Sequence, residues 1–214
     1  MKRLARFTLP IAIFFATFFL VSCSAKKQQQ QPAEEAKAPV IIASLIVLPA
    51  EIERSDKGYD YATTRQLETG VGTINTILQE MLADKKNILL LTENQKESLL
   101  SDFTGNPLAT ARYIGQQMGV DAVMLTLVSR YTERDGGDYS VNQPASVSFK
   151  YQLIHVPTGK ELCMGVFDET QQTLLSNLFS FSKASSRGFK WVKAEQLTRE
   201  GLNEKLNDCQ YLTE

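Results

Sequence analysis

The chain has 214 residues, with 23 Lys and Arg against 24 Asp and Glu and a formal net charge of −1 at pH 7. A nearly neutral chain whose only strongly basic stretch is its first few residues lacks the electrostatic footprint of a nucleic-acid-binding protein. One histidine and three cysteines leave too few ligands for a transition-metal cage or a histidine-dependent catalytic site. With 43% hydrophobic and 22% charged residues, the chain is nevertheless able to build a folded core.

The first 22 residues are predicted to be a signal peptide that lies outside the folded domain. Lys2, Arg3 and Arg6 give a positive start, and an apolar run over residues 9–21 follows. As a helix this run would span about 20 Å, whereas the hydrocarbon core of a bilayer is roughly 30 Å thick. Its length therefore favours a signal peptide, residues 1–22, over a transmembrane anchor.

The run ends in Leu20-Val21-Ser22-Cys23, which resembles the lipobox of bacterial lipoproteins. The resemblance implies cleavage before Cys23 and acylation of its thiol, with palmitate among the acyl chains. Several chains, at about 0.8 kcal/mol per buried CH₂ group, would anchor the protein to a membrane without spanning it. Ser24 stands where the sorting rule of these lipoproteins places Asp for inner-membrane retention, so the resemblance implies the periplasmic face of the outer membrane. The alternative is an ordinary secretory signal with a coincidental cysteine.

Residues 23–39 are predicted to be the lipidated cysteine followed by a disordered tether. The tether is rich in Gln, Ala, Lys and Glu and has no large apolar side chain, so it cannot bury enough surface to offset the entropy of ordering. Fully extended, it reaches at most about 50–58 Å. Residues 40–214 are then expected to form one globular domain.

The first half of this domain alternates strand and helix. Residues 41–48 are almost all apolar and end at Pro49, which is typical of a strand buried on both faces. A polar loop over residues 51–61 leads to a helix whose apolar stripe recurs every three or four positions: Leu67, Val71, Ile74, Leu78 and Met81. A short strand over residues 87–92 and a helix over residues 93–103 follow.

The next helix has the clearest local boundaries in the chain. Asn106 is a favourable N-cap, and Pro107 suits the first helical position. Gly119 is a natural C-terminal stop after Met118. These residues predict a helix over residues 107–118.

Three strands and two helices complete the domain. An apolar strand over residues 120–131 precedes a turn at residues 135–138. Residues 147–153 alternate apolar and polar side chains, which predicts a strand with one wet face. The remaining predicted elements are a tight turn at residues 157–159, a strand over 161–168, and helices over 173–181 and 194–208 joined by a Ser-, Lys- and Gly-rich loop.

The predicted order is β-α-β-α-α-β-β-β-α-α, an α/β fold in a single domain. Strands separated by helices should pair in parallel, and strands joined by tight turns should pair antiparallel. The sequence therefore predicts a mixed sheet flanked by helices.

Residues 46–49, 114–123 and 158–162, together with this order, resemble a superfamily of periplasmic lipoproteins. The superfamily includes the curli secretion lipoprotein and the penicillin-binding-protein activator lipoprotein, and its fold also forms the N-terminal domain of the Tol beta-propeller protein. The resemblance covers roughly residues 41–168 and implies a fold more than an activity. The long transmembrane hairpins of the pore-forming members have no counterpart in residues 51–63 or 91–108.

No motif of acid–base, nucleophilic or phosphate-binding chemistry is found, which argues against an enzyme and against a bound cofactor or metal. Gly70-Val71-Gly72 lacks the third glycine of a dinucleotide loop, and helix packing explains it better. His155 has no Cys, His or paired acids beside it, which favours an edge or solvent-facing histidine. Asp135 and Asp138 flank two glycines and supply too few oxygens for calcium, so a hairpin turn explains them.

Cys163 and Cys209 are the two thiols left after lipidation of Cys23. In an oxidising periplasm a disulfide between them would stabilise the fold by about 3–4 kcal/mol. The alternative is two unconnected small residues, because sequence alone does not bring their Cα atoms within about 7 Å.

Apolar side chains gather around a polar, glycine-containing loop near the end of the chain: Leu174, Leu175, Leu178, Phe179, Phe181, Phe189 and Trp191. Ordinary core packing explains most of them. The alternative is that aromatic side chains here, Phe189 and Trp191 above all, form a docking patch for a partner protein.

These features predict a non-catalytic, lipid-anchored periplasmic adaptor that binds another cell-envelope protein and serves envelope biogenesis, for example by activating a cell-wall synthase. Two other functions stay open: an accessory or oligomeric component of a secretion or surface-assembly apparatus, and an envelope hydrolase. The expected partners are the membrane, through the lipid anchor, and an unidentified envelope protein. Self-association is left open, and nucleic acid is not expected.

Overall fold

The computed structural model describes residues 40–172 and 181–213, which belong to the compact unit Val40–Glu214. Its strands are β1 (Leu45–Val47), β2 (Glu51–Ile52), β3 (Ile88–Leu90), β4 (Ala122–Thr132), β5 (Asp135–Gly136), β6 (Val141–Gln143), β7 (Ser146–His155) and β8 (Glu161–Thr170). Its helices are α1 (Tyr61–Leu82), α2 (Glu93–Leu99), α3 (Pro107–Met118), α4 (Phe181–Ser186), α5 (Ala194–Asn207) and α6 (Gln210–Thr213). None of the helices in these ranges is long and apolar enough to cross a membrane.

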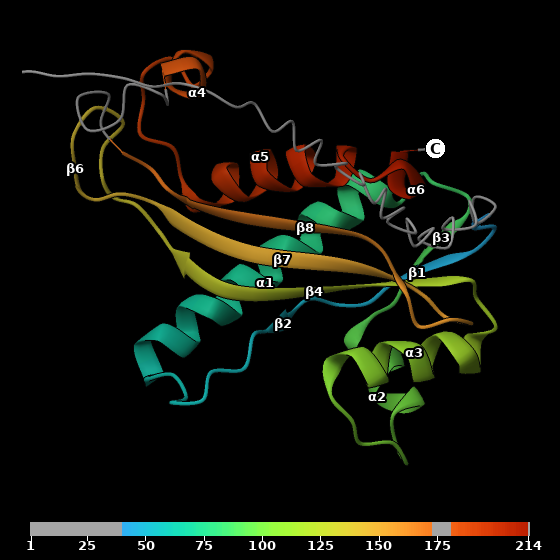
Figure 1. Cartoon of the computed structure of the whole chain (residues 1–214). Helices are drawn as coiled ribbons and strands as arrows, with labels where there is room; N and C mark the ends of the chain where they lie inside the picture. The colour runs from blue at the N-terminus through green and yellow to red at the C-terminus, as the bar shows by residue number, and fades with distance from the viewer. Residues whose placement is uncertain (1–39, 173–180, 214) are drawn as a thin grey trace, which may run out of the picture. The chain divides into compact units, whose positions relative to one another are not determined.

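The main sheet has the strand order β3-β1-β4-β7-β8, and β2 pairs with β4 beyond the end of β1. Strand β1 runs parallel to β3 and to β4, whereas β4, β7 and β8 pair antiparallel. Strands β5 and β6 form a separate two-stranded ribbon. The mixed sheet predicted from the sequence is confirmed, with helices on both of its faces (Figure 1).

Helices cover both faces because β1 is buried on both. Leu45 and Val47 pack into one hydrophobic core, which includes Leu197 of α5 and the buried stripe of α1. Ile46 points the other way and packs into a second core with Ile114 of α3. The continuous apolar run around β1 is what a strand between two helical layers requires.

The second helical layer covers only part of its face of the sheet. Helices α2 and α3 lie near the β1 end, and the long strands β7 and β8 continue beyond them (Figure 1). On this open part, Met164 and Val166 of β8 are each 52% exposed, and Lys150 and Gln152 of β7 are half-buried. The wet face predicted for β7 is therefore confirmed at Lys150 and Gln152, whereas Ser148 on the same face is buried.

A β-bulge in β4 changes which side chains face the first core. The pairing of β4 with β7 shifts register between Val128 and Arg130. One extra residue reverses the alternation of side chains, so Val128 and Tyr131 both face the core formed with α1. Tyr131 then lies directly against Gly70 of α1.

The predicted boundaries of α3 are confirmed at both ends. The Asn106 side chain accepts a hydrogen bond from the Ala109 amide at 2.8 Å, and Pro107 begins the helix. Gly119 closes it with φ of +65°, a left-handed conformation that glycine adopts without steric cost.

Several short elements differ from the prediction. Asp135 and Gly136, predicted to turn, instead form β5 and pair with β6, and residues 137–140 make the turn. Residues 182–186, the first part of the predicted Ser-, Lys- and Gly-rich loop, belong to the helix α4, and α2 ends at Leu99 rather than at residue 103. The predicted helix over residues 173–181 lies outside the described residues apart from its last position. Elements this short carry too few residues for a period to show in the sequence.

Two links hold the C-terminal helices on the sheet. The Tyr151 hydroxyl donates a hydrogen bond to the Lys205 carbonyl oxygen at 2.7 Å. Burial, with the nearby charge of Asp208, raises the pKa of Tyr151 to about 12. Cys163 of β8 and Cys209 after α5 form a disulfide with their Cα atoms 5.9 Å apart, 46 residues apart in the chain.

We predict that the disulfide is present in the protein purified without reductant. Alkylation of the unfolded, unreduced chain should leave Cys163 and Cys209 unmodified, and reduction should expose both to the reagent. Since the bridge closes a loop with a sequence separation of 46, its loss should lower the free energy of unfolding by about 4 kcal/mol. Two alkylated thiols in the unreduced protein would contradict the bridge.

Two glycines of α1 offer a matched test of how the helix packs. A Cβ on Gly70 would lie 2.7 Å from Cβ and Cγ of Tyr131, whereas one on Gly72 would have nothing within 4 Å. We expect Gly70→Ala to destabilise by about 1–3 kcal/mol through overpacking. Gly72→Ala should stabilise by roughly 0.5–1 kcal/mol, because alanine is the better helix former. Urea unfolding of both variants checks the pair, and the opposite ranking would contradict the packing.

Candidate functional site

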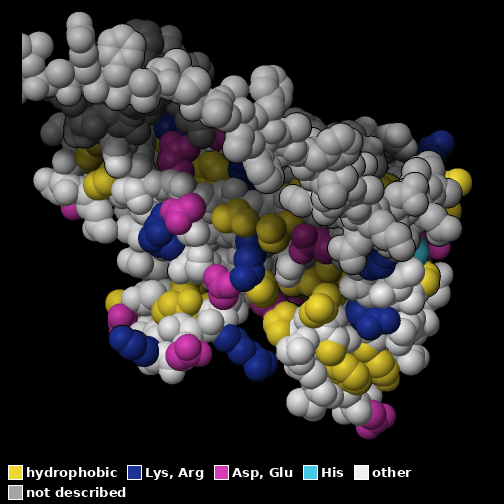
Figure 2. Space-filling view, in the orientation of Figure 1, with side chains coloured by type: hydrophobic (Ala, Val, Ile, Leu, Met, Phe, Trp, Pro, Cys, Tyr) yellow, Lys and Arg dark blue, Asp and Glu magenta, His cyan; other side chains and the backbone are white. Residues whose placement is uncertain are grey.

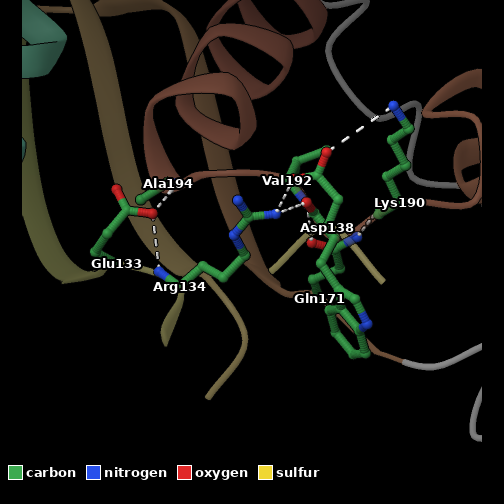
Figure 3. A network of polar contacts seen from close by, with 8 residues as sticks. Glu133, Arg134, Asp138, Gln171, Lys190, Val192 and Ala194 are labelled. Atoms are coloured by element: carbon green, nitrogen blue, oxygen red, sulfur yellow. Dashed lines mark hydrogen bonds and ion pairs between the residues drawn. The ribbon is translucent and has the colours of Figure 1, made fainter. Parts of the chain in front are cut away.

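The segment between α4 and α5 crosses the end of the sheet beside the β5–β6 ribbon. Its backbone is fixed at Trp191, whose amide donates to the Asp138 carbonyl oxygen at 2.8 Å. The Trp191 carbonyl oxygen accepts a hydrogen bond from Arg134 Nη1. The same nitrogen contacts Asp138 Oδ1 at 2.9 Å, so one guanidinium joins the ribbon to the segment (Figure 3).

The buried side chain of Gln171 fixes the residues on either side of Trp191. Its Nε2 donates to the Lys190 carbonyl oxygen at 2.8 Å, and its Oε1 accepts from the Val192 amide at 2.8 Å (Figure 3). These two hydrogen bonds take the place of those that a neighbouring strand would form with the backbone of an extended segment. The two bonds leave both polar ends of a buried side chain satisfied.

Glu133 caps α5 from a distant part of the chain. Lys193 occupies the N-cap position and makes no side-chain cap hydrogen bond. Instead, Glu133 Oε1 accepts from the Ala194 amide at 3.1 Å and from the Arg134 amide at 2.9 Å (Figure 3). A carboxylate at the first amides of a helix also has a favourable interaction with the helix dipole.

A buried arginine fixes the start of the segment. The Arg187 side chain is 5% exposed and contacts Glu169 of β8 at 2.8 Å and Glu200 of α5 at 2.7 Å. Burial alone would lower the pKa of Arg187, but its hydrogen bonds with Glu200 and Glu169 raise it above the ordinary value. Removing one partner from a buried ion pair leaves a buried charge without compensation, which strongly destabilises a protein. These contacts therefore fix the segment at Arg187 as well.

Upon this frame the segment presents aromatic and cationic side chains. Phe189 is 50% exposed and has φ of +56°, a left-handed conformation that costs a bulky residue about 1–2 kcal/mol. Tyr139 of the ribbon turn is 76% exposed, and Lys190 Nζ lies 5.7 Å from the centre of its ring. We call Tyr139, Phe189, Lys190, Trp191 and Lys193 the Trp191 surface.

The structure brings Phe189 and Trp191 into one segment, as the docking hypothesis requires, but the residues that hold the segment were not predicted. Arg134, Asp138 and Gln171 lie between 20 and 57 positions away from Trp191, and no sequence motif connects them. Asp138, interpreted only as a turn residue, also binds Arg134. The one local signal was the lysine at the N-cap of α5, which implies a cap from elsewhere.

The other residues considered from the sequence have structural roles. His155 is partly buried at the end of β7, and its Nδ1 lies 2.8 Å from the Thr158 hydroxyl oxygen. Gly70 packs against Tyr131, which confirms helix packing for that residue. Within residues 40–172 and 181–213, no group of three or more His, Cys, Asp or Glu side chains is arranged to hold a metal ion.

Part of the sequence hypothesis lies outside the described residues. Cys23 and the lipobox are among these positions, as are Leu174, Leu175, Leu178 and Phe179. Lipidation at Cys23 therefore stays a prediction from the sequence. Phe181 is the first residue of α4, and its side chain lies outside the described part of the structure.

No protein-family model and no curated protein matches the chain. Solved structures do: the LpoB C-terminal domain from Escherichia coli is 18% identical with a TM-score of 0.37, the match covering 63% of this chain and 87% of that one. A lipoprotein from Neisseria meningitidis is 19% identical with a TM-score of 0.39, covering 68% and 96%. The PelC dodecamer from Paraburkholderia phytofirmans is 14% identical with a TM-score of 0.37, covering 77% and 89%. Similarity this low says nothing about function, which has to be inferred from the chain's own residues.

The role of Gln171 can be tested with its exposed neighbour as control. Gln171→Leu removes the side-chain amide that binds the Lys190 carbonyl oxygen and the Val192 amide. The free energy of unfolding should fall by about 1–3 kcal/mol for each of these groups left buried and unpaired. We expect hydrogen exchange at the Val192 amide to become faster, whereas Gln172→Leu, at an exposed position, should leave it unchanged. Unaltered protection of Val192 in Gln171→Leu would show that the amide does not hold the segment.

Proposed function

We propose that the protein is a non-catalytic, lipid-anchored adaptor of the bacterial cell envelope, which holds another envelope protein at the Trp191 surface. The observation that carries this proposal is a hydrogen-bonded backbone frame that carries the exposed side chains of Tyr139, Phe189 and two lysines beside the half-buried Trp191. Tyr, Trp and cationic side chains in one patch are typical of binding hot spots. A half-exposed phenylalanine in a left-handed conformation is not explained by stability alone, and strain of this kind clusters at functional sites.

The geometry of the domain suits an adaptor. Asp121, just before β4, accepts hydrogen bonds from the Ala43 and Ser44 amides at 2.8 and 2.9 Å. These bonds fix the place where the tether joins the domain, and the Ala43 bond above all holds the pKa of Asp121 below its usual value. Strand β4 then runs about 33 Å, at roughly 3.3 Å per residue, to the network that holds Trp191. The Trp191 surface therefore lies at the opposite end of β4 from Ala43 and Ser44.

The charged groups around this surface favour binding over catalysis. Glu133 caps α5, Arg187 is held between two carboxylates, and Asp138 binds Arg134. A general acid or base needs a group free to exchange a proton with a substrate. A tether that restricts the domain to a shell near its membrane raises the local concentration, so a modest interface is sufficient.

Self-assembly is the second candidate, and one observation favours it. Among the described strands β8 has a neighbour on one side only, and it is ten residues long with Met164 and Val166 exposed. A long edge strand is a template for pairing with another chain. Native mass analysis distinguishes the two candidates, since a ring would favour a component of an assembly apparatus and a monomer the adaptor.

The proposal predicts that one substitution removes the lipid anchor and a different substitution removes the docking surface. Labelled palmitate should incorporate into the wild-type chain and not into Cys23→Ser, whose signal peptide should stay uncleaved. A photo-crosslinking amino acid at Tyr139 should capture an envelope protein, and Trp191→Ala should abolish that product while the melting temperature changes by no more than about 2–4 °C, the shift of roughly 1 kcal/mol.

Tyr61 provides the matched control, because it is an 80% exposed aromatic residue at the start of α1. Tyr61→Ala should leave the crosslinked product unchanged. If Trp191→Ala loses both partner and stability, Trp191 is a packing residue. If palmitate is not incorporated, the anchor is refuted.

A further inference from the structure

We propose that the partner brings an acidic peptide segment to the Trp191 surface, with carboxylates that pair with Lys190 and Lys193 and apolar side chains that pack against the aromatic residues. This inference rests on the proposed function and adds the chemistry of the partner. It starts from a cavity of about 290 Å³ beside Trp191, whose charged lining consists of Arg134, Arg187, Lys190 and Lys193 against the single carboxylate of Asp138.

Two of these cations already have partners within the protein. Arg187 is enclosed by Glu169 and Glu200, and Arg134 is bound to Asp138. Lys190 is held more loosely, since its Nζ lies 3.9 Å from Asp138 Oδ2 and 46% of its side chain is exposed. Lys193 is exposed and, among the residues that the structure describes, has no ion pair or side-chain hydrogen bond. Lys193 therefore has no carboxylate partner among the described residues, and Lys190 has only Asp138, which it shares with Arg134.

This cationic surface is a local feature, because the whole chain has a formal net charge of −1. Lys193 also stands at the N-cap of α5, where a positive charge opposes the helix dipole and helix stability favours Ser, Asp or Asn. Positions that break a local rule without a structural gain are expected at functional sites. The lysine is thus better explained by what it meets outside the domain.

The size and position of the cavity favour a protein partner over the other anionic candidates. A volume of about 290 Å³ is at the lower limit for sites that enclose a whole small molecule, and it suits one or two side chains. The cavity is lined by Trp191, which is two residues from the half-exposed Phe189, so its occupant would also meet aromatic side chains. The three aromatic residues give the apolar contact area that a peptide segment, and not a free anion, would use.

The test uses the full-length lipidated protein in detergent and the partner captured through position 139, purified. Lys190→Glu/Lys193→Glu should weaken binding at least about tenfold at 50 mM NaCl, with a smaller effect at 500 mM, because screening removes most of an exposed charge interaction. Lys57→Glu/Lys86→Glu makes the same charge change at two exposed lysines elsewhere and should stay within about twofold of wild type. Replacing the acidic residues of the partner segment by lysine should restore binding to Lys190→Glu/Lys193→Glu.

The outcomes separate this inference from the proposed function. If the captured protein binds Lys190→Glu/Lys193→Glu as well as wild type, or if both double variants weaken binding equally, the acidic segment is refuted and the adaptor stands. If the product captured at position 139 is a glycan or a lipid, the acidic peptide is also refuted. If the crosslinker at position 139 captures no protein in the otherwise wild-type chain, or if Trp191→Ala leaves the captured product unchanged, the docking function fails, and this inference with it.

Discussion

Burial of β1 on both faces is the constraint on which the architecture depends. Leu45 and Val47 face one core, and Ile46 faces the other. A strand of this kind is stable only between two layers, so the chain has to place α1 on one side of the sheet and α2 with α3 on the other. The parallel pairs on both sides of β1 follow, because each neighbouring strand is reached through a helical crossover. Strand β7 returns beside β4 through the β5–β6 ribbon, and β8 returns beside β7 through a short turn, so both pairs are antiparallel.

The antiparallel half of the sheet gives the domain two distinct ends. Strands β4, β7 and β8 are each ten or eleven residues long, whereas β1 and β3 have three. The long strands therefore extend past the two-layer core, and within the described ranges no helix covers part of one of their faces (Figure 1). Hydrophobic and charged side chains lie close together on the visible described surface (Figure 2). Beyond this core, polar contacts, and not buried apolar side chains, hold the chain in place. Arg134, Gln171 and Glu133 fix the segment around Trp191, and a buried network of this kind is stable only when its members are satisfied.

The parts of the fold that were predictable are those that depend on neighbours in the sequence. Asn106, Pro107 and Gly119 mark the two ends of α3, which is 12 residues long, and the period of Leu67, Ile74 and Leu78 defines α1. The site depends on contacts of the opposite kind. Glu133 caps a helix 61 positions later, and Arg134 reaches a carbonyl 57 positions later. Phe189 and Trp191 were identified by their residue type. No period or motif in the sequence predicts that the Gln171 side chain binds the backbone of residues 190 and 192. Strands β5 and β6 are too short for an alternation of apolar and polar residues to show.

The frame also explains how a strained phenylalanine persists. A left-handed conformation costs Phe189 about 1–2 kcal/mol. Five backbone groups between Lys190 and Ala194 are bound by Gln171, Arg134, Asp138 or Glu133, and each such bond contributes roughly 0.5–1.5 kcal/mol. The bonds together exceed the strain, so the backbone is determined by its neighbours and not by its own preference. A segment ordered before its partner arrives loses less entropy on binding. The order of the segment in the free protein and the restriction by the tether both favour binding. Each reduces the entropy lost on association, which a weak interface would otherwise have to offset.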